Sequence, residues 1–145
     1  DSAKGKAIAI KMFDECDVIF HAAGGAGVGI IEAAKEKGSY AIGCDMDQSS
    51  LAPKNVLTSS IKDVGKAVKT VSTSLKNGEK IGGKTFSYGI KENCVGIPKE
   101  NPNVPENVKN AVKAVEEKVR SGEIIPPGTS ASYEEFIKLL PNLKV

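Results

Sequence analysis

The sequence contains no tryptophan, one histidine and few aromatic residues, which make up 5% of its 145 residues. This shortage leaves few side chains on which unpaired nucleic-acid bases could stack. The formal net charge is only +2, and the lysines are distributed among acidic residues instead of forming one dense basic stripe. We therefore do not expect nucleic acid as a partner.

Long apolar runs and paired cysteines are also absent. No apolar run approaches the roughly 18 residues that a membrane-spanning helix needs. Cys16, Cys44 and Cys94 are odd in number and widely spaced, which fits neither a disulfide framework nor a CxxC metal site, so we expect small buried residues. The sequence opens at Asp1 without a leader-like segment, and we expect any targeting segment to lie outside it.

Apolar residues recur at helical or strand spacing along most of the chain. The spacing and the glycine and proline positions predict helices over residues 3–14, 27–37, 61–77 and 105–121, and a last short helix bearing Tyr133, Phe136, Ile137 and Leu140. Strands are predicted over residues 17–21, 40–45, 55–59 and 84–89.

This alternation of strands and helices predicts βαβ crossovers and therefore a Rossmann-like α/β fold, a mostly parallel sheet flanked by helices. The length supports one hydrophobic core but not two. We expect a single α/β lobe over residues 1–145, with residues 123–145 as a C-terminal loop and short helix.

Three segments directly follow predicted strands, where ligands bind in open parallel sheets. The first is the glycine cluster at 22–29, whose missing β-carbons let a ligand approach the backbone and leave amides accessible at a helix N-terminus. The second is Asp45-Met46-Asp47-Gln48, and the third is Lys62, just beyond the strand at 55–59.

Asp45 has the chemistry of a sugar-binding residue, because a carboxylate can accept hydrogen bonds from both hydroxyls of a ribose. The same placement suits a dinucleotide, since Asp45 lies about twenty residues past the glycine cluster. However, a GxGxxG motif that begins at Gly25 and Gly27 requires glycine at position 30, which is Ile30. A nucleoside and an NAD-type cofactor both stay open at this point.

Each candidate also has a purely structural explanation. The glycine cluster can form a tight turn, Asp45 can cap a loop, Lys62 can be a solvated charge, and His21 can be a packing residue. GxSxG, HExxH and P-loop motifs are missing from the sequence. We therefore expect no catalytic residue, metal site or bound cofactor.

Several of these motifs together resemble a known family. The run from Asp17 through Phe20-His21-Ala22-Ala23-Gly24-Gly25 to Gly27, followed by Tyr40-Ala41-Ile42-Gly43-Cys44-Asp45-Met46-Asp47-Gln48, is similar to the signature of the basic membrane protein (BMP) family. These proteins are solute-binding lipoproteins of ABC transporters and include purine nucleoside receptors. The similarity continues through Leu51-Ala52-Pro53, Lys62 and Gly89-Ile90-Lys91-Glu92 and spans nearly the whole chain.

The resemblance implies a type I periplasmic-binding fold, in which two α/β lobes close over a nucleoside. This chain would be the second lobe, with the first lobe and the lipid-bearing cysteine upstream of Asp1. By similarity, Gly25, Asp45 and Lys62 fall where family members contact the ribose. The implied protein is not an enzyme, delivers its ligand to an ABC transporter permease, and is lipid-anchored on the outer side of the bacterial cytoplasmic membrane.

The chain departs from the family pattern at two places. It has Ala26 where threonine is usual, and Cys44-Asp45-Met46-Asp47 where Val-Asp-Ser-Asp is usual, so a shifted ligand preference is an alternative. Two other functions stay in competition, an NAD-type enzyme domain and the ligand-sensing domain of a transcriptional regulator. We expect the isolated lobe to bind ligand weakly and to self-associate through surfaces meant for the other lobe.

Overall fold

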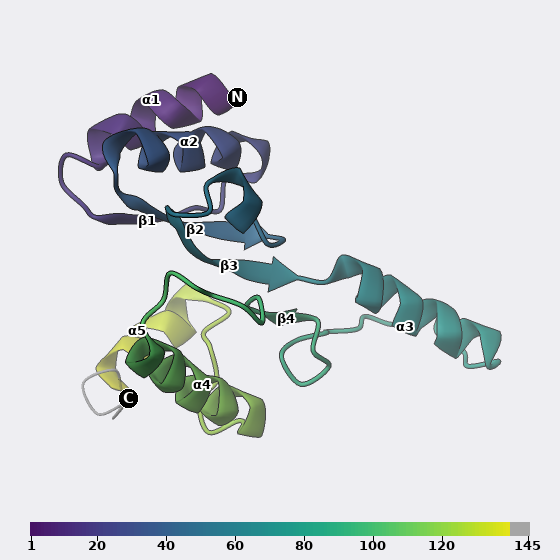
Figure 1. Ribbon diagram of the computed structural model, residues 1–145. Helices are drawn as coiled ribbons and strands as arrows, with labels where there is room; N and C mark the ends of the chain where they lie inside the picture. Colours follow the sequence, from purple (N-terminus) through teal and green to yellow (C-terminus); the bar gives the residue numbers. More distant parts are fainter. Residues whose placement is uncertain (140–145) are drawn as a thin grey trace. The chain divides into compact units, whose positions relative to one another are not determined.

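The computed structural model describes residues 1–139 and divides into two compact units, Asp1–Val104 and a second unit that begins at Pro105. Figure 1 labels their helices and strands. The first unit contains α1 (Ser2–Met12), β1 (Val18–Phe20), α2 (Gly27–Lys37), β2 (Tyr40–Asp45), β3 (Val56–Lys62), α3 (Val64–Lys76) and β4 (Val95–Gly96), with short 3-10 helices at Gly24–Ala26 and Ser49–Leu51. The second contains α4 (Glu106–Ser121) and α5 (Ser130–Leu139).

The sheet has the strand order β1-β2-β3-β4. β1 pairs with β2 and β2 with β3 in parallel, whereas the short β4 runs antiparallel to β3. Phe20 pairs with Ile42, and Asp45 pairs with Ile61, so β1, β2 and β3 point their carboxyl ends toward the same edge. The predicted α/β class with a mostly parallel sheet is confirmed.

The core of the first unit lies between α1, α2 and the sheet. α1 and α2 pack side by side, and α2 also contacts β1 and β2 (Figure 1). Ile31 of α2 and Val56 of β3 are almost completely buried, and alanines at 9, 33, 34 and 41 let the layers approach closely. The other buried members of the cluster are Phe13, Ile19 and Ala52.

Two predicted elements match the structure residue for residue, the helix at 27–37 and the strand at 40–45. The helix ends where Gly38 adopts a φ of 68°, a left-handed conformation that glycine reaches without steric cost. β3 runs longer than predicted and includes Ile61 and Lys62, so Lys62 is the last residue of the strand and does not lie beyond it.

The helix predicted from residue 61 starts at Val64 instead. Asp63 is its N-cap, and its carboxylate accepts a hydrogen bond from the Lys66 backbone N–H at 2.7 Å. The predicted helix began too early, because Ile61 was counted in its apolar face although this residue belongs to β3.

The predicted strand over residues 84–89 is wrong. This segment has no regular structure, and the rings of Phe86 and Tyr88 stack on each other with centroids 6.1 Å apart. The edge of β3 is paired by Val95–Gly96, with the Asp63 N–H donating to the Cys94 carbonyl at 2.7 Å. The alternation of Phe86 and Tyr88 is typical of a strand. A strand also needs the free edge of a neighbouring strand to pair with, and Val95–Gly96 occupies the edge of β3.

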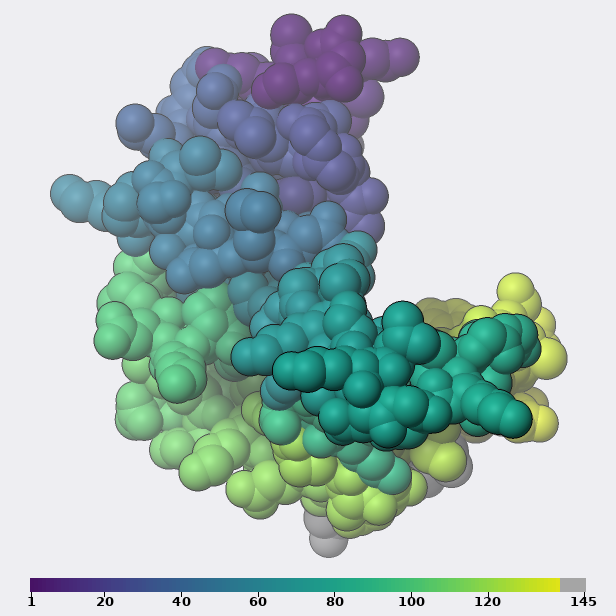
Figure 2. Space-filling view, turned by 90° about the vertical axis from the view of Figure 1, so that its right-hand side faces the viewer, coloured from purple at the N-terminus to yellow at the C-terminus, as the bar shows by residue number. Residues whose placement is uncertain are grey.

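Helix α3 is amphipathic, as predicted, yet it has no buried residue. Val64, Val68 and Leu75 on its apolar face are exposed, and Figure 2 shows the teal surface of this segment uncovered on the side toward the viewer. The predicted last helix is confirmed as α5, although Leu140, which it was expected to carry, lies outside the described residues. Within residues 1–139, no helix has the length and apolar character needed to cross a membrane.

Gly27 makes one of the closest approaches in this fold, because a Cβ there would overlap the ring of His21. Gly27→Ala should lower the free energy of unfolding by about 1–3 kcal/mol, the usual cost of overpacking. Gly25→Ala is the matched control, since nothing lies within 4 Å of its added Cβ, and it should change stability by less than about 0.5 kcal/mol. Urea unfolding of both variants tests this, and equal losses would contradict the assigned packing.

Candidate ligand-binding site

The three site residues predicted from the sequence follow or end the three parallel strands. Asp45 is the last residue of β2, Lys62 is the last residue of β3, and Gly25 lies in the 3-10 helix that follows β1. Since these strands are parallel neighbours, the three residues lie along the carboxyl edge of the sheet.

Asp45 and Lys62 form an ion pair across adjacent strand ends, with 2.7 Å between Lys62 Nζ and Asp45 Oδ1. The hydrogen bond and the charge of Lys62 hold the pKa of the Asp45 carboxyl below its ordinary value, with a smaller contribution from Cys44. The same contact raises the pKa of Lys62. Their side chains remain 47% and 61% exposed, so both charged groups are accessible to a ligand.

The backbone at Asp45 has an uncommon conformation, with a φ of 70° in a residue that is not glycine. Aspartate tolerates this left-handed region better than most residues. The Met46 N–H then donates to the Cys44 carbonyl at 2.9 Å, which closes a tight turn. The turn places Asp45 at the start of an exposed loop directly beside Lys62.

An open pocket adjoins this ion pair and is lined by residues 45–47 and 61–65. Gly25 does not line this pocket. Its backbone is nevertheless exposed, with open space where a side chain would stand. The structure therefore brings two of the three predicted residues into contact and leaves the third accessible at the end of β1.

Sequence reasoning missed a group of buried and partly buried polar residues beneath the same edge. His21, expected to be a packing residue without a visible partner, is only 3% exposed and lies 3.0 Å from Gln48 through Nε2 and Oε1. Gln48 in turn contacts Ser59 of β3. The sequence does show that His21 and Gln48 are polar residues next to predicted strands. They are 27 positions apart, however, so their contact becomes visible only in the folded structure.

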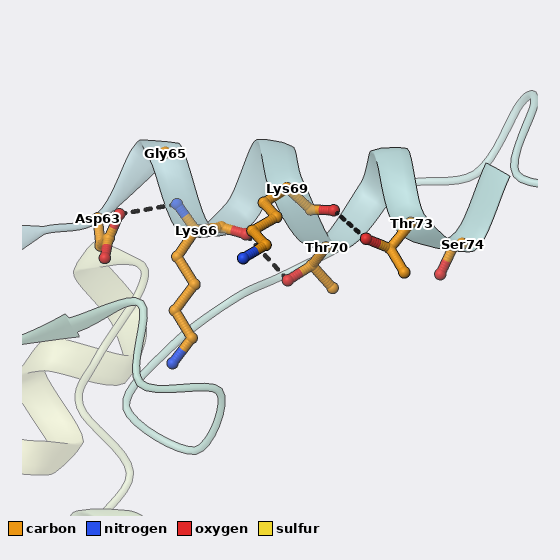
Figure 3. Close-up of a pocket in the computed structure, with 7 residues that line it drawn as sticks. All are labelled: Asp63, Gly65, Lys66, Lys69, Thr70, Thr73 and Ser74. Carbon is orange, nitrogen blue, oxygen red and sulfur yellow. Dashed lines mark hydrogen bonds between the residues drawn. The ribbon is translucent and has the colours of Figure 1, made fainter. Parts of the chain in front are cut away.

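A second open pocket runs along the polar face of α3, where Figure 3 shows its lining residues. Thr70 and Thr73 donate their hydroxyl hydrogens to the backbone carbonyls of Lys66 and Lys69, at 2.9 and 2.8 Å. The Asp63 carboxylate caps the N-terminus of α3 by accepting the Lys66 N–H. These groups form their hydrogen bonds within their own helix, and no predicted site residue lines this pocket.

The cysteines and metal-binding residue types do not form a further site. Cys94 is buried, as expected, whereas Cys16 and Cys44 are only partly buried, and all three are free thiols. In the part of the chain that the structure describes, no three His, Cys, Asp or Glu side chains are grouped closely enough to hold a metal ion.

Fold and site together define an α/β lobe with accessible charged groups at the carboxyl edge of its sheet. Residues 1–129 match the family model described as "ABC transporter substrate-binding protein PnrA-like". The chain belongs to this family, as its motifs predicted.

Curated relatives carry the name basic membrane protein. The chain is 43% identical to basic membrane protein A of Borreliella afzelii over 95% of this chain and 44% of that protein. It is 44% identical to basic membrane protein B of Borrelia garinii subsp. bavariensis, over 96% of this chain and 40% of the relative. The chain thus spans less than half the length of these relatives.

Solved structures share the fold at lower sequence identity. An ABC transporter solute-binding protein from Aeropyrum pernix K1 matches with a TM-score of 0.75 and 24% identity, over 98% of this chain and 49% of that one. A transcriptional activator of the comK gene from Bacillus halodurans matches with a TM-score of 0.77 and 23% identity, over 88% of this chain and 45% of that one. These likenesses establish the fold.

Replacing Lys62 by methionine should raise the pKa of the Asp45 carboxyl toward its ordinary value, because the main stabilising partner of the carboxylate is lost. In the unaltered chain, the stabilisation from this pair is present above the unfolded-state pKa and disappears as the pH falls through the lowered folded-state pKa. A carbon-13 NMR titration of the Asp45 carboxyl measures the shift directly.

Lys37→Met is the matched control, because Lys37 pairs with Asp14 at the same 2.7 Å distance but away from Asp45. This variant should leave the Asp45 titration unchanged. An Asp45 midpoint that does not respond to Lys62→Met would show that the pair does not persist in solution.

Proposed function

We propose that this chain is the second lobe of a two-lobe, non-catalytic solute receptor that binds a nucleoside and delivers it to an ABC transporter. One observation supports the site above all, the accessible Asp45–Lys62 pair at the carboxyl edge of the sheet in a chain of this family. Gly25 is the third member of the proposed site. By "intact receptor" we mean this lobe joined to a first lobe, at the length of its relatives.

The ion pair has suitable chemistry for the ribose of a nucleoside. Lys62 lowers the pKa of the Asp45 carboxyl, and an ionised carboxylate offers acceptor positions to two neighbouring hydroxyls. The lysine ammonium has further hydrogens to donate to the hydroxyl oxygens. The exposed backbone at Gly25 adds a surface that a ligand can approach closely.

One lobe alone supplies only part of the contacts that a nucleoside needs. A few polar contacts contribute a free energy comparable to the entropy cost of association, so the isolated chain should bind weakly. The other lobe would bury the opposite side of the ligand and provide the stacking of its base. We therefore assign the sugar to this lobe and expect the other lobe to select among bases.

The departures from the family pattern lie within or beside this site. Met46 is exposed in the turn that follows Asp45, and Ala26 ends the 3-10 helix that contains Gly25. Each stands where a hydroxyl is usual, so fewer hydrogen bonds are available there. We still favour a purine nucleoside as the ligand, because the basic membrane protein family includes purine nucleoside receptors.

The proposed partners and location follow from the same family membership. The receptor would present its ligand to the transporter permease on the outer side of the cytoplasmic membrane, held there by a lipid anchor. An NAD-type enzyme domain and a regulatory sensor domain share this architecture, and the fold alone does not choose between such functions. Ligand-binding measurements decide between them.

Asp45→Asn in the intact receptor should abolish most of the thermal stabilisation by purine nucleosides, because the charge-assisted hydrogen bonds to the ribose are lost. Asp14→Asn is the control, since Asp14 forms a similar exposed ion pair elsewhere. Melting temperatures with purine and pyrimidine nucleosides, ribose and NAD provide the measurement. Full stabilisation of Asp45→Asn by nucleosides would refute the site, and stabilisation by NAD alone would support the enzyme alternative.

A further inference from the structure

A connected set of partly buried hydrogen bonds lies directly beneath the proposed site. Gln48 Oε1 is 3.0 Å from Nε2 of His21 and also accepts the Cys44 backbone N–H at 2.9 Å. The Gln48 backbone N–H donates to Ser59 Oγ at 3.1 Å, and Ser59 is fully buried. The set therefore joins the end of β1, the turn after β2 and the middle of β3.

The hydrogen bonds in this network have one defined direction. The Cys44 N–H can only donate, so the atom that faces it must be the amide oxygen of Gln48. An amide oxygen only accepts, and Nε2 of His21 must therefore carry the hydrogen. Within residues 1–139, the other ring nitrogen, Nδ1, is buried without a hydrogen-bond partner.

Close backbone contacts hold the network from two sides. The His21 ring packs against Gly27, the first residue of α2, where a Cβ would overlap the ring. Gly43 of β2 faces Ser59 and Gln48, and a Cβ there would lie 2.8 Å from Gln48 Oε1. His21 thus occupies the space between the glycine segment that contains Gly25 and the turn that begins at Asp45.

We propose that His21, Gln48 and Ser59 are positioning residues, which fix the spacing between the Gly25 segment and the Asp45–Lys62 pair without contacting the ligand. Gln48 ties the far end of the turn back to Cys44 and to β3, and this holds Asp45 at its uncommon φ of 70° beside Lys62. The role in ligand binding depends on the proposed function above, whereas the effect on Asp45 does not.

A merely structural role is the competing explanation, and Asn55 provides a matched control for it. Its side-chain amide donates to the carbonyls of Ser39 and Ala34 at 2.9 and 3.4 Å, directly before the start of β3. This position is at the opposite end of the strand from Lys62. Removing these bonds should destabilise the fold without disturbing Asp45.

The test compares Gln48→Met, which keeps side-chain length but removes the acceptor, with Asn55→Leu. Nitrogen-15 NMR reports the tautomer of His21, the single histidine of the chain. A carboxyl titration reports the pKa of Asp45, and calorimetry on the intact receptor reports the affinity for a purine nucleoside.

Gln48→Met should release His21 from its Nε2–H tautomer, raise the Asp45 pKa toward its ordinary value and weaken nucleoside binding about tenfold. Asn55→Leu should lower the melting temperature and leave all three readouts as in the unaltered chain. Ser59→Ala, which removes one acceptor and little volume, should change the same readouts in the same direction by less, and it replaces Gln48→Met if that variant does not fold.

An unchanged tautomer and unchanged Asp45 titration in the Gln48 and Ser59 variants would overturn the proposal, whatever the ligand is. If Asn55→Leu changes the His21 tautomer, the Asp45 pKa and the nucleoside affinity by the same amounts, the network has only a structural role. If the unaltered receptor binds no nucleoside, the proposed function fails, but the two measurements without ligand still decide whether the network positions Asp45.

Discussion

The parallel pairing of β1, β2 and β3 is the constraint on which the proposed site depends. Parallel strands direct their carboxyl ends to one edge, so residues far apart in the sequence become neighbours without any specific attraction between them. The register that pairs Asp45 with Ile61 leaves Lys62 one residue further along β3, within reach of the carboxylate. A shift of this register would separate the two charges.

The Asp45–Lys62 pair is better understood as preorganised binding chemistry than as a source of stability. Ion pairs at this degree of exposure are screened by water and salt and add little to the stability of a fold. What the pair does supply is a carboxylate held in a defined place. Such preorganisation reduces the cost of ordering groups when a ligand binds, and the proposed role of the partly buried network below the turn is the same.

Local signals were sufficient to predict much of this architecture. Gly38 marked the end of α2, and the apolar run from Tyr40 marked β2. The rule that ligands bind at strand ends selected the glycine cluster, Asp45 and Lys62, and the family resemblance then singled out Gly25. The helix and strand signals depend on neighbouring residues alone. The strand-end rule needs only the direction in which each parallel strand runs. The sequence shows which residues are polar. It does not show which of them are in contact in the folded chain.

The features that sequence reasoning missed depend on partners distant in the chain. The segment at 84–89 has strand-like alternation but no free edge to pair with, and only the fold shows that Val95–Gly96 takes that edge. His21 finds its partner 27 residues away, across two strand ends. The apolar face of α3 was predicted correctly from its periodicity, whereas its exposure in this chain was not.

The most direct measurement is a crystal structure of the intact receptor with a bound purine nucleoside. Our account predicts that the ribose hydroxyls lie within hydrogen-bonding distance of the Asp45 carboxylate and the Lys62 ammonium, close to the backbone at Gly25. It also predicts that His21 and Gln48 lie beneath them, out of contact with the ligand. A nucleoside bound away from the carboxyl edge of this sheet would contradict the central claim.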